Sequence, residues 1–285
     1  MMVNIGFTKM QGIGNDYIYI DCLKSCPENL PSLSRKMSDR HFGVGGDGII
    51  LILPSEVADF KMRIFNADGS EARMCGNGAR CVVKYVYDNG LISDKDITLE
   101  TLSGVISLLL HTDESGEVST VTVDMGVPSF IPNDIPVIAS GERVSDFELE
   151  TGVPAVPVVK INAVSIGNPH AVIFADNLDD VDIAAVGYAV ENNKIFPDRA
   201  NVEFIKVNSR GDITMRVWER GSGITMACGT GACASVAVAV ANGLTDEKVR
   251  VHLDGGDLDI FWDRSSGHIF LTGTAKTVFT GIYGI

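Results

Sequence analysis

Met74-Cys75-Gly76-Asn77-Gly78-Ala79 and Ala227-Cys228-Gly229-Thr230-Gly231-Ala232 are two versions of one pattern, and this pattern predicts the fold. In each version a cysteine precedes a glycine-rich turn, which leads into a run with helical periodicity. The start of a helix has unpaired backbone N–H groups and the positive end of the helix dipole, so it favours a thiolate and can bind a carboxylate. One such turn is weak evidence for a site, whereas two in one chain are strong evidence.

The same spacing of 153 positions relates several other motifs. It carries Gly14-Asn15 onto Gly167-Asn168, and Asn89-Gly90-Leu91 onto Asn242-Gly243-Leu244. Across residues 62 to 91, 10 of 30 positions are identical to the residue 153 places later, without a gap. Since separate motifs keep one spacing, we infer a duplicated, domain-sized unit rather than a coincidence of glycine-rich turns. Duplication predicts pseudo-two-fold symmetry, in which two equivalent turns face one cleft.

The length and charge of the chain limit its class. The 285 residues suffice for two domains with full cores. With 23 basic and 37 acidic residues the formal charge is −14, which argues against nucleic acid or an anionic membrane surface as a partner. The apolar runs are too short to cross a bilayer, and the first ten residues lack the apolar core of a secretion signal. We therefore expect a soluble, cytoplasmic protein.

We predict neither a metal site nor a dinucleotide-binding site. The spacings of the six cysteines contain no C-x-x-C pair, and no two of the five histidines have a metal-binding spacing, so we expect no metal. Residues 43–48 match G-x-G-x-x-G letter for letter. The dinucleotide-binding motif follows a strand and opens a helix, whereas here the glycines follow a predicted helix and enter a strand. We interpret them as a connection.

In each half of the chain, predicted strands surround one central helix. Helices are predicted at about 32–41, 78–89, 182–192 and 231–242, and the last is apolar on all sides, as a buried helix is. We therefore predict an α/β (α+β) protein with two pseudo-symmetric domains, each a mostly antiparallel sheet wrapped around a central helix. The domains are predicted at residues 1–128 and 129–274, with residues 275–285 as a candidate to pack back on the first.

Two thiols at helix starts favour one type of reaction. A well-placed helix N-terminus is worth up to about 2 kcal/mol, which would lower a thiol pKa from roughly 8.5 towards 7. One such thiol suggests a nucleophile. Two equivalent thiols suggest a base on one face of a carbon atom and an acid on the other, an arrangement that inverts a stereocentre without a cofactor. The alternatives are a redox dithiol pair and two buried structural cysteines.

Several longer motifs are typical of one protein family. They are Gly12-Ile13-Gly14-Asn15-Asp16-Tyr17, Phe65-Asn66-Ala67-Asp68-Gly69-Ser70-Glu71, the turn at residues 74–81, Gly167-Asn168-Pro169-His170, and Glu219-Arg220-Gly221-Ser222-Gly223 leading to the turn at residues 227–232. Through these motifs the sequence resembles the diaminopimelate epimerases over essentially its whole length. The resemblance implies a cofactor-independent epimerase that interconverts LL- and meso-2,6-diaminopimelate, in the synthesis of lysine and of cell-wall precursors. It implies that Cys75 and Cys228 are the two-base pair.

The resemblance also implies substrate contacts. The turns Gly76–Asn77 and Gly229–Thr230 are implied to hold the carboxylate at the reacting carbon with their N–H groups and to stabilise the charge that develops there. Arg220 suits the distal carboxylate, since a guanidinium binds carboxylates bidentately, and Glu219 suits an ammonium group. His170 is implied to lie near the thiols; the alternative is a turn histidine with no direct role. The remaining implied contacts are Asn15, Asn66, Asn168 and Asn201.

The sequence also allows two other kinds of function. The rival within the same class is a racemase or epimerase for another amino acid, or an isomerase like those of phenazine synthesis, which lack the cysteine pair. The rival from another class is an amino-acid-binding protein that uses Cys75 and Cys228 as a redox latch. One departure from the resembled family is Gly48, where many members have glutamine. The sequence decides neither which thiol serves which stereoisomer nor whether a homodimer forms.

Overall fold

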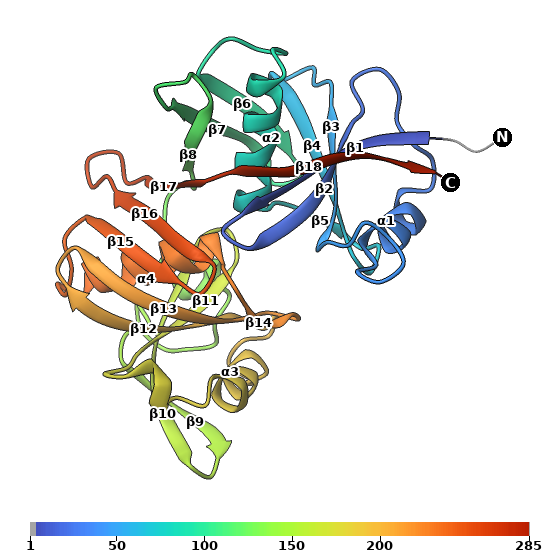
Figure 1. Cartoon of the computed structure of the whole chain (residues 1–285). Helices are drawn as coiled ribbons and strands as arrows, with labels where there is room; N and C mark the ends of the chain where they lie inside the picture. Colours follow the sequence, from blue (N-terminus) through green and yellow to red (C-terminus); the bar gives the residue numbers. More distant parts are fainter. Residues whose placement is uncertain (1–3, 285) are drawn as a thin grey trace. The chain divides into compact units, whose positions relative to one another are not determined.

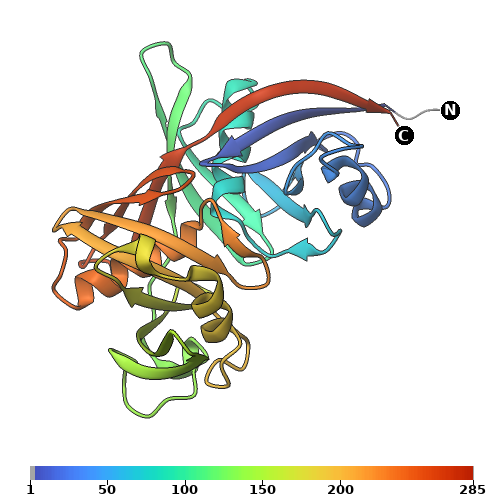
Figure 2. The ribbon, with the colours of Figure 1, turned by 60° about the horizontal axis from the view of Figure 1, so that its bottom comes forward.

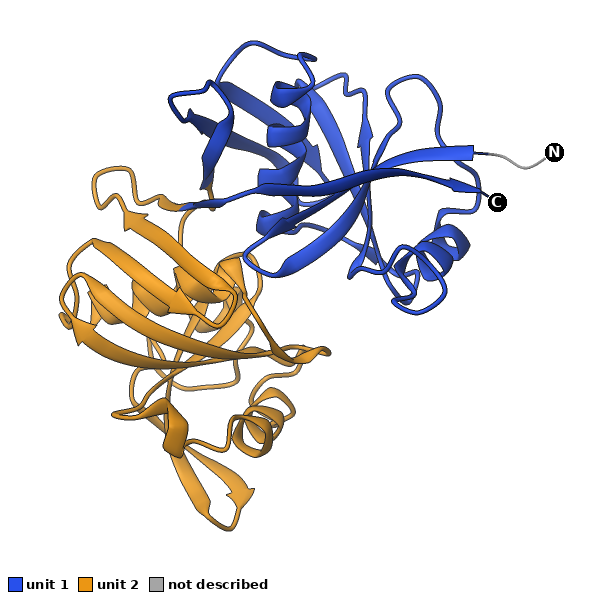
Figure 3. Cartoon of the chain, viewed as in Figure 1, with its two compact units in different colours: residues 1–123, 272–285 blue, residues 124–271 orange. Residues whose placement is uncertain are grey.

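The chain forms two compact units (Figures 1 and 2), which Figure 3 distinguishes by colour. The computed structural model describes residues 4–284. Unit 1 contains the residues up to Val123 together with the C-terminal segment from Thr272, and unit 2 is Asp124–Leu271. The residues after the first boundary bind within unit 2: Met125 N donates to Ile269 O at 2.9 Å.

Unit 1 is built on a sheet with the strand order β18-β1-β2-β3-β4-β6-β7-β8. The pairs β2–β3 and β4–β6 are parallel, and the other neighbours are antiparallel. The C-terminal strand β18 lies beside β1, with Asn4 opposite Gly284 (Figures 1 and 2). The strands are β1 (Asn4–Gly12), β2 (Asn15–Asp21), β3 (Gly48–Leu53), β4 (Phe60–Asn66), β5 (Glu71–Ala72), β6 (Asp96–Thr101), β7 (Gly104–Thr112), β8 (Val118–Asp124) and β18 (Lys276–Gly284).

Unit 2 has the strand order β9-β10-β11-β12-β13-β15-β16, and β14 pairs with β13. Here β11–β12 and β13–β15 are the parallel pairs. The strands are β9 (Phe147–Val153), β10 (Val156–Ser165), β11 (Pro169–Phe174), β12 (Asn201–Ser209), β13 (Asp212–Glu219), β14 (Gly223–Thr225), β15 (Lys248–Leu253), β16 (Gly256–Trp262) and β17 (Ile269–Thr274), which runs across the second unit boundary. Two short 3₁₀ helices are η1 (Pro132–Asp134) and η2 (Leu178–Asp180).

Each unit has one central helix and one outer helix. The central helices are α2 (Gly76–Asp88), which packs against β1, β2 and β7, and α4 (Gly229–Ala241), which packs against β10 to β13 and β16. Most residues of α4 are buried, as its apolar sequence predicts. The outer helices are α1 (Leu30–Ser38) and α3 (Ile183–Glu191). None of the helices within residues 4–284 is both long enough and apolar enough to cross a membrane.

The duplication inferred from the sequence is present in the structure. Both ends of α3 follow those of α1 by 153 residues, and both ends of α4 follow those of α2 by the same number. The strand register repeats with the same spacing of 153 residues: Tyr17 opposite Gly48 corresponds to His170 opposite Asn201. The predicted fold of two pseudo-symmetric domains, each with a sheet around a central helix, is therefore confirmed.

The predicted helix boundaries were less accurate. Both central helices begin two residues before the predicted start, because the cysteine is the capping residue and the glycine-rich turn is already helical. Cys75 and Cys228 have extended backbones, and each sulfur accepts an N–H from the first turn. The helix predicted at residues 32–41 ends at Ser38, because the Asp39 side chain accepts the N–H groups of His41 and Phe42.

Gly48 occupies a position that has no room for a side chain. A Cβ atom there would lie 2.1 Å from the carbonyl oxygen of Phe65 and 2.9 Å from the ring of Tyr17. The glutamine that many members of the resembled family carry would therefore need a displaced backbone. The polar group at this place is instead the neighbouring Asp47, which binds Asn15 and Arg40.

We expect Gly48→Ala to destabilise the protein by about 1–3 kcal/mol or more, because the methyl group meets backbone atoms that cannot rotate away. Gly6→Ala is the matched control, since Gly6 also lies in a strand and an added Cβ meets nothing within 4 Å. The measurement is the urea midpoint of unfolding followed by circular dichroism. Equal midpoints for the two variants would contradict the packing argument.

Candidate active site

Cys75 caps α2 and is held by two contacts. Its sulfur accepts the N–H of Gly78 at 3.4 Å, and its S–H donates to Oδ1 of Asn15 at 3.3 Å. Gly76 and Asn77, the first two residues of α2, are buried directly behind the partly exposed thiol. Their N–H groups belong to the first turn, where an α-helix has no internal acceptors. The thiol therefore lies beside N–H groups suited to an anion.

A network of charged groups fixes the amide of Asn15. Its Nδ2 donates to Asp47 Oδ2 at 2.7 Å, so its Oδ1 faces Cys75. Arg40 binds Asp16 at 2.7 Å and Asp47 at 3.0 Å, and Lys9 binds Asp16 at 2.6 Å. Burial alone would raise the pKa of Asp16, but the hydrogen bonds from Arg40 and Lys9 outweigh it and lower the pKa. Sequence reasoning missed Asp47, because it treated residues 43–48 only as a connection.

The other two predicted asparagines of unit 1 have clear positions. The Oδ1 atom of buried Asn77 accepts from Arg80 Nη1 at 2.9 Å, so this side chain is turned towards the core. Only the backbone of Asn77 is then available for the predicted role. Asn66 is the last residue of β4, and its Nδ2 donates to Ser70 Oγ at 3.1 Å.

Cys228 caps α4 in the same way as Cys75 caps α2. Its sulfur accepts the N–H of Gly231 at 3.3 Å and lies 3.5 Å from Oγ1 of Thr230. Gly229 and Thr230 are the first two residues of α4. Nδ2 of Asn168 donates to the Thr230 hydroxyl at 3.4 Å. This hydrogen bond connects the turn before β11 to the residue that contacts the Cys228 sulfur.

The surroundings of Cys228 overturn part of the predicted electrostatics. Burial raises the pKa of the Cys228 thiol well above its ordinary value, and the carboxylates of Glu219 and Glu203 raise it further. Hydrogen bonds from Thr230 and Gly231 lower it only in part. The expectation of a pKa near 7 was wrong for Cys228, because it considered the helix dipole and neither burial nor the two carboxylates.

His170 lies behind Cys228 between two acceptors. Its Nε2 is 2.9 Å from Oδ1 of Asn168, and its Nδ1 is 2.7 Å from Oε1 of Glu203. His170 and Glu203 are both fully buried. Sequence reasoning missed Glu203. The available signal was an acidic residue within the otherwise apolar run Val202–Ile205.

The turn after β13 carries Glu219 and Arg220. Oε1 of Glu219 accepts the Thr225 hydroxyl at 2.5 Å, and Oδ1 of Asn201 accepts the backbone N–H of Arg220 at 3.0 Å. The Arg220 guanidinium donates to the Asp198 carbonyl at 2.9 Å. Buried Glu191, the last residue of α3, also holds this turn. It accepts hydrogen bonds from Trp218 Nε1 at 2.7 Å and from Gly221 N at 2.8 Å.

The predicted residues therefore gather at the N-terminus of the central helix in each unit. Unit 1 joins Asn15, Cys75 and the first turn of α2, with Asn66 at the end of β4. In unit 2, hydrogen bonds link Asn168, His170, Thr230 and Cys228. Glu219 and Arg220 lie at the adjoining turn, which Asn201 binds. Within residues 4–284 no cluster of side chains is suited to a metal ion.

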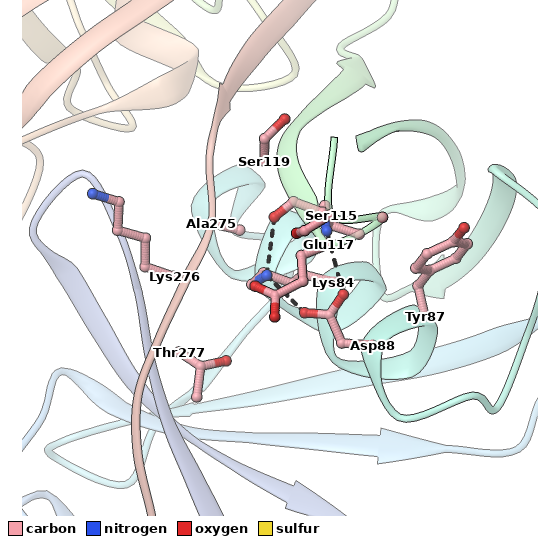
Figure 4. A pocket seen from close by; sticks show the side chains of 11 residues that line it. Lys84, Tyr87, Asp88, Ser115, Glu117, Ser119, Ala275, Lys276 and Thr277 are labelled. Carbon is pink, nitrogen blue, oxygen red and sulfur yellow. Dashed lines mark hydrogen bonds and ion pairs between the residues drawn. The ribbon is translucent and has the colours of Figure 1, made fainter. Parts of the chain in front are cut away.

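A surface pocket of about 750 Å³ in unit 1 is separate from these residues (Figure 4). It is lined by the end of α2, the β7–β8 connection and the start of β18, and contains none of the predicted site residues. Lys84 points to Asp88 and to the carbonyl of Val118, at 2.6 and 2.9 Å, so its charge is already satisfied.

Comparison with known proteins gives one consistent family. A family model described as "Diaminopimelate epimerase" matches residues 7–131 and 162–278. Proteins named diaminopimelate epimerase are 51% identical in Desulfovibrio desulfuricans, with 100% of both chains covered, and 51% identical in Pelotomaculum thermopropionicum, with 97% of this chain and 98% of the relative covered. The protein of that name from Methanococcus maripaludis is 48% identical over 96% of this chain and 98% of its own.

Solved structures of lower identity share the fold. A hydroxyproline epimerase from Agrobacterium vitis has a TM-score of 0.72 at 16% identity, covering 99% of this chain and 93% of its own. A phenazine biosynthesis protein of the PhzF family from Bacillus anthracis has a TM-score of 0.68 at 20% identity, covering 100% and 99%. The predicted fold class agrees with both.

We expect alkylation of Cys228 by iodoacetamide to be slow at neutral pH, because only the thiolate reacts and the raised pKa keeps the thiol protonated. A nearby negative charge disfavours the thiolate, so Glu219→Gln lowers the pKa and moves the alkylation profile to lower pH. Mass spectrometry of the Cys228 peptide gives the rate at each pH.

The control is Glu148→Gln, an exposed carboxylate of unit 2, which should leave the Cys228 profile unchanged. A Glu219→Gln profile that stays where it was, or moves to higher pH, would contradict the electrostatic explanation.

Proposed function

Because the chain belongs to the diaminopimelate epimerase family, we propose that it interconverts LL- and meso-2,6-diaminopimelate through the thiols of Cys75 and Cys228. The enzyme is an amino-acid epimerase, and its reaction belongs to the synthesis of lysine and cell-wall precursors. Full-length relatives of this name, at about half identity, support the substrate. The observation that carries the chemistry is the pair of equivalent helix caps, each with a cysteine sulfur bound by a first-turn N–H.

In the proposed mechanism the two thiols have opposite protonation states. One thiolate removes the proton from the α-carbon, and the other thiol donates its proton to the opposite face, which inverts the centre. Afterwards the two sulfurs have exchanged protonation states, so the enzyme is ready for the reverse direction. No electrons are transferred, and the number of protons on substrate and enzyme is unchanged.

Loss of the α-proton places negative charge on the α-carbon and its carboxylate, and this charge requires stabilisation. The proposed donors are the N–H groups of Gly76 and Asn77 in α2 and of Gly229 and Thr230 in α4. Donors fixed by a helix need no rearrangement as the charge develops, which is the main advantage of such preorganised groups. The positive ends of the two helix dipoles act in the same direction.

The distal end of the substrate carries a second carboxylate and ammonium group. We assign the carboxylate to Arg220 and the ammonium to Glu219, with Asn15, Asn66, Asn168 and Asn201 as further polar contacts. The turn that carries Arg220 is held by Asn201 and Glu191, which supports a fixed position for the guanidinium. His170 acts through Asn168 in this proposal, since its Nε2 binds that side chain.

Two further properties are part of the proposal. We place the enzyme in the cytoplasm, because its relatives are biosynthetic epimerases. We also propose a homodimer, because β18 exposes Val278, Phe279 and Ile282 by 56%, 45% and 75%. Exposed apolar residues gathered on one strand are typical of a surface that associates.

Removal of either thiol is expected to abolish the reaction. Cys75→Ala and Cys228→Ala should each reduce turnover by roughly 10²–10⁴-fold or more, the usual contribution of a positioned acid or base. The measurement is the incorporation of solvent deuterium at the α-carbon of diaminopimelate by NMR, with circular dichroism as a check of folding.

Cys26→Ala, at an exposed cysteine, is the matched control and should keep full activity. Near-normal turnover in a single-thiol variant would refute the two-thiol mechanism. A wild-type protein that binds diaminopimelate without exchanging its α-proton would instead support an amino-acid-binding protein.

Arg220→Lys tests the contact with the distal carboxylate. We expect a KM higher by about tenfold or more, since lysine cannot form the bidentate pair and a charged hydrogen bond is worth about 1.5–3 kcal/mol. Steady-state kinetics with diaminopimelate provides the value. An unchanged KM would remove Arg220 from the proposed substrate contacts.

A further inference from the structure

Glu203 is a buried carboxylate without an assigned role. It lies in β12 with no exposed surface, and its Oε1 is 2.7 Å from Nδ1 of His170. A Cβ atom added to Gly231 would lie 2.7 Å from the same oxygen, so the carboxylate packs directly beneath the first turn of α4. Its Oε2 has no hydrogen-bond partner among residues 4–284. A buried charge is unfavourable unless it is paired, so its retention requires a physical reason.

The hydrogen bonds of His170 define how this charge is paired. Nε2 faces the amide oxygen of Asn168, and Nδ1 faces a carboxylate oxygen of Glu203. An amide oxygen only accepts, so Nε2 donates to Asn168, while Nδ1 binds the Glu203 carboxyl group. The Asn168 amide has this orientation because its Nδ2 donates to Thr230. The Glu203 carboxyl group therefore fixes the ring from the side of α4.

Unit 1 has no such pair at the equivalent positions. The 153-residue repeat places Tyr17 where His170 stands and Ile50 where Glu203 stands. A Cβ atom on Gly78, the counterpart of Gly231, would lie 2.6 Å from the terminal methyl group of Ile50. Thus the first turn of α2 rests on an apolar side chain, and the first turn of α4 rests on a carboxylate.

We propose that Glu203 is a positioning residue that holds His170, and through it Asn168 and Thr230, beneath Cys228, and that its carboxylate makes the two thiols chemically unequal. This inference rests on the proposed function of the two thiols. The two otherwise equivalent thiols then differ in the resting enzyme, in which Cys228 keeps its proton. Cys228 is then the acid in the first proton transfer of an enzyme in that state.

Within unit 2, the charged groups beside Cys228 lie in strands that adjoin α4. They are Glu219 at the end of β13, Glu203 in β12 and His170 in β11, and α4 itself carries no charged residue. Glu203 and Glu219 both raise the pKa of the Cys228 thiol. Removal of the Glu203 charge should therefore favour the thiolate of Cys228 and leave Cys75 unaffected.

The test is Glu203→Gln in the full-length enzyme, because glutamine keeps the size and one acceptor oxygen and loses the charge. We expect alkylation of Cys228 by iodoacetamide at pH 8 to rise about three- to tenfold, since one pKa unit is a tenfold change in thiolate. Alkylation of Cys75, and of both thiols in Glu148→Gln, should change less than about twofold on the same scale. Equal Cys228 rates in Glu203→Gln and wild type would overturn the proposal.

A second readout is the pH profile of kcat/KM. Activity falls at high pH when the acid loses its proton, so the alkaline limb of Glu203→Gln should move to lower pH. A role in packing alone would lower kcat without moving this limb, and that result would overturn the proposal. If the wild type shows no α-proton exchange, the proposed function fails, while the alkylation result still decides the role of Glu203.

A second variant keeps the test decisive if Glu203→Gln does not fold. The double variant His170→Tyr, Glu203→Ile copies the residues at the equivalent positions of unit 1, and its Cys228 alkylation should rise as in Glu203→Gln. A rate equal to that of wild type would overturn the proposal.

Discussion

The structure depends on a cysteine sulfur that accepts a backbone N–H at the first turn of a central helix. This contact occurs twice, from Gly78 to Cys75 and from Gly231 to Cys228. It needs an extended cysteine followed by residues that pack closely on the strands behind, which is why Gly78 and Gly231 have no room for a side chain. The same contact starts the helix and places a thiol beside unpaired N–H groups.

The parts of the fold that the sequence predicts are those encoded by local pattern or by repetition. Both central helices, the duplication and the cysteines at the helix starts follow from glycine-rich turns and a constant spacing of 153 residues. The predicted helix starts were two residues late, because a capping cysteine and a helical glycine look like a loop in sequence. Boundaries between the units depend on long-range hydrogen bonds, such as that from Met125 to Ile269, which no local pattern encodes.

The residues that the sequence proposes for the site lie around the two helix N-termini, and their electrostatics was predicted less well. A helix dipole can be read from sequence, whereas the burial of Cys228 and the approach of Glu203 and Glu219 depend on how β12 and β13 pack against α4. Asp47 was missed for the same reason, since its partners Asn15 and Arg40 lie on other segments. The 153-residue repeat makes Ile50 and Glu203 equivalent in position. Their difference shows that equivalent positions need not carry equivalent charges.

The pairing of β18 with β1 has a consequence for synthesis of the protein. Unit 2 is continuous in the chain and is synthesised before β18. Unit 1 begins first but lacks the strand beside β1 until β18 has been made. Domains usually fold in the order in which they emerge. Here unit 1 is completed only after unit 2 has been synthesised, and its β1 edge stays open to other strands until β18 pairs with it.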